Sequence, residues 1–153
     1  MAAGMITPPQ TYAQWASVLD LFKNKSDDES VIDAMKKGNI QWQSGVAERF
    51  SQRLVDAVNF RLNNAIDRFQ KELNRSSGQE REIVRAILAL RKEVGFLANA
   101  IDLPVIPESD RTRYRQLVID QANKIQQSLE DSAKSDRTGK LASIIRNNKV
   151  NSI

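Results

Sequence analysis

The sequence predicts an all-α fold: a single-domain bundle of five to six helices built on a long antiparallel helical hairpin. The first observation is a heptad stripe of apolar residues spaced 4-3-4-3-4, which comprises Ile83, Ile87, Leu90, Val94, Leu97 and Ile101. This spacing puts all its members on one helix seam, where they interlock with a neighbouring helix of the same chain or of a second copy in a homodimer. The second observation is that the chain has only 6 Gly and 4 Pro, which leaves little turn chemistry for an all-β fold.

Capping boxes predict where helices begin, because a Ser or Thr side chain and a Glu or Gln three residues later satisfy each other's backbone donors. Three segments match this pattern: 11–14 (TYAQ), 26–29 (SDDE) and 77–80 (SGQE). The first two open two short helices within residues 11–40, and the third opens the helix that carries the heptad stripe. Residues 1–10 lie before the first box, and we expect them to be disordered or extended.

A long helix is expected over about residues 44–75, where apolar residues recur mostly at every fourth position. They are Val46, Phe50, Leu54, Val58, Leu62, Ile66, Phe69 and Leu73. Because a step of four exceeds the 3.6 residues of a turn, the stripe drifts by about 40° per step. The N-terminal half of this helix is therefore predicted to face the two short helices, and the C-terminal half to face the heptad helix. Residues 76–78 then form the tight reversal of the hairpin.

Pro104 and Pro107 interrupt the helical pattern, because two prolines three residues apart do not fit inside one regular helix. The apolar segment around them reads as a buried corner. A further helix is predicted over 108–133, which completes a long-helix bundle over 44–133. Its apolar side carries Tyr114, Val118, Ala122, Ile125 and Leu129. Residues 134–153 form a basic tail with a last short helix after Gly139.

The composition excludes much of the usual chemistry of enzymes, since the chain has no His and no Cys. Thiol nucleophiles, disulfides and mixed carboxylate–His metal sites are therefore absent. An acidic group over residues 27–33 suits the positive end of a helix dipole better than a cation site. We therefore predict no enzyme activity, no catalytic residue, no metal site and no cofactor. The exception left open is an activity with a metal held by oxygen ligands alone.

The chain is expected to be soluble and cytoplasmic, without a membrane partner. No stretch approaches the roughly 18 to 20 apolar residues of a spanning helix, and the N-terminus does not read as a signal peptide. The formal net charge is +4. Five bases and one acid lie between Ser132 and Ile153, so this tail holds the entire excess of positive charge.

An arginine cluster and the basic tail are the candidate contact sites. Arg111, Arg113 and Arg115 lie in the first turns of a helix, where the dipole disfavours cations, so they are candidates for contact with an anion or an acidic partner. Solvated arginines are the alternative. In the tail, two sets of residues are candidates: the basic set Lys134, Arg137, Lys140, Arg146 and Lys149, and the apolar set Leu141, Ile144 and Ile145. The first would contact nucleic-acid phosphates and the second would dock a protein, unless the terminus is simply frayed.

The first functional hypothesis is a non-enzymatic protein-interaction protein, namely an adaptor, a regulator or an assembly factor that acts through helical surfaces. The alternative is a nucleic-acid-binding accessory protein that uses the basic tail and the arginine cluster. Phe60 lies off the main stripe of its helix, which indicates a second interface, either with the short helices or with another copy.

Overall fold

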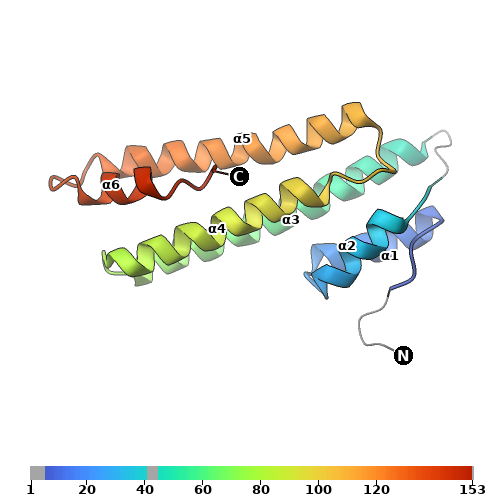
Figure 1. Ribbon diagram of the computed structural model, residues 1–153, viewed down its shortest axis with the longest axis horizontal. Helices are drawn as coiled ribbons and strands as arrows, with labels where there is room; N and C mark the ends of the chain where they lie inside the picture. Colours follow the sequence, from blue (N-terminus) through green and yellow to red (C-terminus); the bar gives the residue numbers. More distant parts are fainter. Residues whose placement is uncertain (1–5, 41–44, 153) are drawn as a thin grey trace. The chain divides into compact units, whose positions relative to one another are not determined.

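A computed structural model describes residues 6–40 and 45–152, and over these residues the chain forms six α-helices and no strand (Figure 1). The helices are α1 (Tyr12–Lys23), α2 (Asp28–Lys37), α3 (Val46–Arg75), α4 (Glu80–Ala100), α5 (Glu108–Ala133) and α6 (Lys140–Asn147). The predicted all-α bundle is confirmed. Residues 1–5 and residue 44, the expected start of the long helix, lie outside the described residues. None of the helices in the described part is both long enough and apolar enough to span a membrane.

Contacts between residues divide the chain into two compact units. Unit 1 consists of Met1–Arg61 and Asp102–Arg111, and unit 2 consists of Leu62–Ile101 and Thr112–Ile153. Helix α3 therefore belongs to unit 1 with its N-terminal half and to unit 2 with its C-terminal half. This division agrees with the drift of its apolar stripe, which gives the two halves different packing partners.

Helix α1 begins at the predicted capping box. The Thr11 side chain accepts a hydrogen bond from the Gln14 amide at 3.2 Å, and the Gln14 side chain accepts one from the Thr11 amide at 3.2 Å. The predicted box at Ser26 is wrong. The Ser26 amide instead donates to the Leu21 carbonyl at 3.0 Å, beside Lys25 in the left-handed conformation (φ 56°). These features close the C-terminus of α1 as a Schellman motif, so Ser26 ends one helix rather than beginning the next.

The capping box predicted at Ser77 is also wrong, although the tight reversal there is confirmed. Ser77 (φ 51°) and Gly78 (φ 78°) both adopt positive φ, and the Gln79 amide donates to the Ser76 carbonyl at 3.0 Å. This is the pattern of a turn with two left-handed central residues, which removes Ser77 from the cap position. Helix α4 starts instead after Gln79, without a side-chain cap.

The core of unit 1 is built around Trp15, which is fully buried. Its ring meets Phe50 of α3 edge to face, with centroids 5.2 Å apart, and its indole N–H donates to the Asn39 carbonyl at 2.8 Å. A Cβ atom at Gly38 would lie 2.7 Å from Cζ2 of Trp15, so this position needs glycine for the backbone to pass the ring. Leu103 and Ile106 are buried as well, whereas Pro104 and Pro107 are exposed, so the predicted buried corner holds only in part.

In unit 2, the heptad seam of α4 is buried within the chain. Its six residues, Ile83, Ile87, Leu90, Val94, Leu97 and Ile101, are each at most 5% exposed. Figure 1 shows the C-terminal half of α3 running beside α4, and α6 also contacts α4. A second copy of the chain would therefore have to displace these neighbours to reach the seam.

The buried side of α5 departs from the predicted stripe towards its C-terminal end. Tyr114, Val118 and Ala122 are buried as expected, but Ile125 and Leu129 are only half-buried. Gln126 is buried instead, and its side-chain carbonyl accepts a hydrogen bond from the Val150 amide at 2.9 Å. The stripe shifts because this face of α5 receives the C-terminal segment of the chain.

The C-terminal tail is docked over the described residues. Ile144, Ile145 and Val150 are buried, and the Arg91 guanidinium donates to the Lys149 carbonyl at 3.4 Å. The expected last helix is therefore present as α6 and packs on its own unit. Of the readings of the tail, the frayed terminus does not hold for residues up to 152.

Candidate functional site

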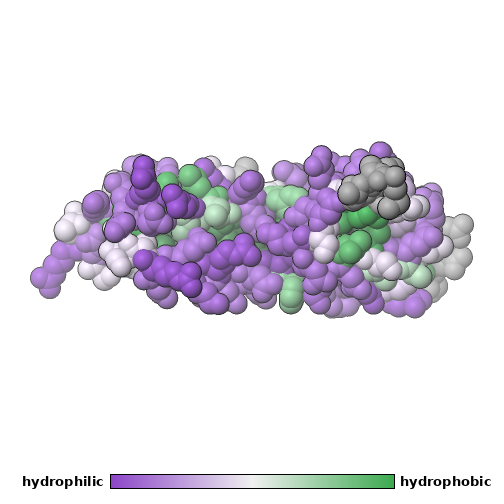
Figure 2. Space-filling view, turned by 90° about the horizontal axis from the view of Figure 1, so that it is seen from below, coloured by the Kyte–Doolittle hydropathy of each residue, from purple (hydrophilic) through white to green (hydrophobic). Residues whose placement is uncertain are grey.

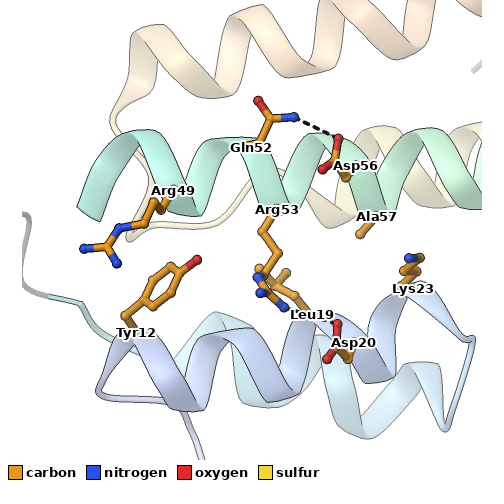
Figure 3. Close-up of a pocket in the computed structure, with 9 residues that line it drawn as sticks. All are labelled: Tyr12, Leu19, Asp20, Lys23, Arg49, Gln52, Arg53, Asp56 and Ala57. Atoms are coloured by element: carbon orange, nitrogen blue, oxygen red, sulfur yellow. Dashed lines mark hydrogen bonds and ion pairs between the residues drawn. The ribbon is translucent and has the colours of Figure 1, made fainter. Parts of the chain in front are cut away.

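An open groove lies between α1 and the N-terminal half of α3 in unit 1 (Figure 3). Its volume is about 350 Å³. It is lined by Tyr12, Leu19, Asp20, Lys23, Arg49, Gln52, Arg53, Asp56 and Ala57. On α3 these residues fall at i, i+3, i+4, i+7 and i+8, and on α1 at i, i+7, i+8 and i+11, which is the spacing of a single helix face. The groove is therefore formed by two facing helix stripes.

One end of the groove carries a cation on an aromatic ring. The Arg49 guanidinium lies 5.2 Å from the centroid of Tyr12, and Figure 3 shows the two side chains reaching towards each other. Its Nε also donates to the Gly45 carbonyl at 3.3 Å. Arg49 has no ion pair with another described residue, so the remaining N–H donors of its guanidinium are open to solvent or to an external acceptor.

Lys23 lines the other end of the groove and forms a second pair of the same kind with Phe60, which lies beside the lining residues. Lys23 Nζ lies 4.7 Å from the ring centroid of Phe60, which is 41% exposed. Phe60 thus contacts a short helix, as one of its two predicted alternatives requires, and still offers part of its ring to solvent. Stacking of this kind stabilises an exposed site by about 0.5–1 kcal/mol, which is enough to orient the lysine without burying it.

The middle of the groove holds two carboxylates and one guanidinium, a net charge of −1. Arg53 forms an ion pair with Asp20 at 3.4 Å, and the Gln52 side-chain amide donates to the Asp56 carboxylate at 3.0 Å (Figure 3). The uncompensated positive charge of the groove therefore lies at its two ends.

Beyond the groove, α1, α2 and α3 are locked together by Arg61, whose side chain is 1% exposed. It donates to both carboxylate oxygens of Asp28, at 2.9 and 3.0 Å, and to the Phe22 carbonyl at 3.0 Å. The guanidinium also lies 4.8 Å from the Phe22 ring centroid. This contact fixes the two helix stripes that form the groove. It was not predicted from the sequence, although buried Ala57 and Ala65, four residues to either side, mark a place with room for a long side chain.

The three predicted arginines have different environments. Arg111 forms an ion pair with Asp102 at 3.2 Å, and Arg113 lies 5.2 Å from the ring centroid of Tyr114. Arg115 is exposed and has no ion pair among the described residues. Arg111 is thus already engaged with a carboxylate of its own unit.

The tail residues separate by chemistry. Ile144 and Ile145 are buried and Leu141 is half-buried, so the apolar set packs on its own unit instead of being presented to a partner. The basic set is exposed throughout: Lys134, Arg137, Lys140, Arg146 and Lys149. Lys134 forms an ion pair with Asp131 at 3.3 Å.

The turn before α6 is organised by Asp136. Its carboxylate accepts hydrogen bonds from the Leu141 amide at 2.9 Å and from the Thr138 amide and hydroxyl at 3.2 and 2.9 Å. The Leu141 amide is the largest cause, followed by Thr138, of a pKa of Asp136 below its ordinary value of 3.8. These bonds favour the ionised carboxylate and hold the start of α6.

The acidic residues at the start of α2 do not assemble into a cation site. Asp28 is paired with Arg61, and Asp33 forms an ion pair with Lys37 at 3.1 Å. Within the described part of the chain, no three or more Asp or Glu side chains are grouped so as to hold a metal ion.

Comparison of the chain with protein-family models, with curated proteins and with solved structures found no match. What the protein does has therefore to be inferred from its own residues and geometry.

Proposed function

We propose that this chain is a non-enzymatic interaction protein, acting as an adaptor, regulator or assembly factor, and that the groove between α1 and α3 receives a segment of a protein partner. The observation that carries the proposal is the pair of cation–aromatic contacts, Arg49 on Tyr12 and Lys23 on Phe60, at the two ends of this groove. Arginine and aromatic side chains supply most of the binding energy at protein interfaces, and here both are within reach of solvent.

The dimensions suit a short segment. Arg49 and Phe60 are eleven positions apart on α3, which corresponds to about 16 Å at 1.5 Å per residue. An extended chain spans this distance with about five residues.

The charges favour a partner segment with a carboxylate at each end. In the middle, Arg53 is paired with Asp20 and Asp56 adds one negative charge, whereas Arg49 and Lys23 at the ends have no ion pair within the described chain. An acidic side chain beside Arg49 would gain a charge-assisted hydrogen bond, and an apolar side chain would cover the exposed part of Phe60.

In this proposal the protein acts in the cytoplasm, a reducing compartment in which a chain without cysteine has no disulfide to lose. It uses no cofactor. A homodimer through the heptad seam is not part of the proposal, because that seam is covered by the chain itself.

The test is an affinity capture with the full chain from an extract of the source organism. Arg49→Ala/Phe60→Ala removes one member of each pair. Arg68→Ala/Leu88→Ala is the matched control, since it also removes one arginine and one exposed apolar side chain (Leu88 is 38% exposed). We expect the groove variant to retain a partner at least about tenfold less well, which corresponds to about 1.4 kcal/mol, while the control retains it. Equal retention by both variants would contradict the proposal.

A further inference from the structure

The charges of the chain are unequally divided between the two units. Unit 2 contains fifteen Lys and Arg and nine Asp and Glu, a net charge of +6, whereas unit 1 contains eight and ten, a net charge of −2. Exposure increases the contrast, because fourteen of the fifteen bases of unit 2 are exposed and only four of its nine acids are. The exposed residues of unit 2 therefore carry a larger excess of positive charge than unit 2 as a whole.

Five exposed bases without an ion pair lie at one end of unit 2, while others, such as Arg115 and Lys124, lie along its helices. Figure 1 shows the turn between α3 and α4 and the turn between α5 and α6 at the same end of this unit. We call five exposed residues in and beside these turns the basic tip: Lys71, Arg75, Arg81, Arg137 and Lys140. None of their side chains forms an ion pair or a hydrogen bond with another residue of the described chain. The neighbouring Arg85 and Lys134, by contrast, are paired with Glu82 and Asp131.

Two members of the basic tip stand where the fold itself disfavours them. Arg81 lies in the first turn of α4, and Lys140 is the first residue of α6. A cation in the first turn of a helix opposes the helix dipole, which costs several tenths of a kcal/mol at an exposed position. This cost is offset in part by Glu80 and Glu82 in the same turn of α4, and by Asp136, whose carboxylate attracts Lys140.

We propose that the basic tip binds double-stranded nucleic acid through its phosphate groups, without reading its sequence. In the described part of unit 2, Phe69 and Tyr114 are buried and Phe96 is half-buried, so there is no exposed ring on which unpaired bases would stack. A contact with a phosphate group needs no aromatic ring. The partner is thus a duplex backbone rather than a single strand.

Two other anionic partners fit less well. Leu88 is the one exposed large apolar side chain in the described part of unit 2, and Figure 2 shows a mostly hydrophilic face with small separate hydrophobic areas. An acidic protein would find no apolar centre there. A membrane surface would require an apolar helix face to insert, but Ile144 and Ile145 of α6 are buried.

The test measures binding of the full chain to a 25-base-pair DNA duplex as a function of salt concentration. Five phosphate contacts predict a slope of log K against log salt of about −4.5, or about 500-fold weaker binding between 50 and 200 mM salt. Arg75→Gln/Arg81→Gln/Arg137→Gln leaves two contacts and lowers the slope to about −1.8, with binding at 50 mM salt weakened at least about tenfold.

The matched control is Lys92→Gln/Arg115→Gln/Lys124→Gln, which removes the same charge from exposed, unpaired positions of unit 2 outside the basic tip. It is expected to keep a slope near −4.5. An equal loss in this control would overturn the assignment to the tip. No salt-dependent binding, or equally tight binding of polyglutamate or of vesicles of anionic lipid, would overturn the assignment to nucleic acid. The circular-dichroism spectra of all variants should match that of the wild type, because every substituted side chain is exposed.

Discussion

Replacing Arg61 by methionine should destabilise unit 1 strongly, because this guanidinium is the buried link between α1, α2 and α3. The substitution removes two hydrogen bonds to Asp28 and one to the Phe22 carbonyl, all between 2.9 and 3.0 Å. Breaking a buried ion pair by removing one partner costs about 3–5 kcal/mol. The side chain of Asp28 is 30% exposed and regains water in the variant, so we expect the lower end, about 3 kcal/mol.

The assay is urea unfolding followed by tryptophan fluorescence, since buried Trp15 reports on unit 1. A double-mutant cycle separates the pair from the packing of the side chain. Asp28→Asn alone should also destabilise the chain, but combined with Arg61→Met it should add little, with a coupling energy of about 2 kcal/mol. The reasoning is refuted by a cost below about 1 kcal/mol for Arg61→Met, or by additive costs in the cycle, because either result would show that the ion pair contributes little to the fold.

Three other predictions concern single positions. Gly38→Ala places a methyl group 2.7 Å from Trp15 Cζ2, so we expect overpacking to cost about 1–3 kcal/mol and to lower the Tm, whereas Gly139→Ser meets no neighbour and is strained only by its backbone φ of 73°. Gln126→Ala removes the acceptor of the Val150 amide, and hydrogen exchange should then show faster exchange at Val150 while the α4 amides stay protected. The pKa of Asp136 is lowered in the fold, so its stabilisation of the α6 start is complete above its ordinary pKa of 3.8 and is lost as the pH falls through the lowered value. The protection of the Leu141 amide, measured relative to the intrinsic exchange rate at the same pH, should fall in that acidic range in the wild type, and an Asp136→Ala variant should already lack this protection at neutral pH.

Helix positions could be predicted from the sequence because they depend on local periodicity. The stripes of the long helices and the tight reversal at 76–78 are local properties, and the helices formed close to the expected bounds. Capping was less predictable. Ser26 and Ser77 have the right residues three positions later, but each amino acid also suits the turn that ends the preceding helix, and there the backbone takes positive φ instead.

The candidate groove could not be predicted, because it depends on residues that are distant in sequence. Tyr12 and Arg49 meet only once the α1–α2 pair has packed on α3, and neither residue is unusual on its own helix. For the tail, the exposure of the basic residues could be predicted, but the role of the apolar residues could not. Its basic residues are exposed as a charged face should be, but whether Ile144 and Ile145 served a partner or their own unit depended on contacts that the sequence does not encode locally.

The measurement that tests the central claim most directly is photo-crosslinking from within the groove. A photoreactive amino acid in place of Gln52, which lines the groove, is compared with one in place of Lys36, an exposed position of α2 outside the groove lining. We predict a discrete crosslinked protein adduct from position 52 that is absent from position 36 and disappears with Arg49→Ala/Phe60→Ala. The same adducts from both positions, or an adduct at 52 that survives the double substitution, would contradict the account.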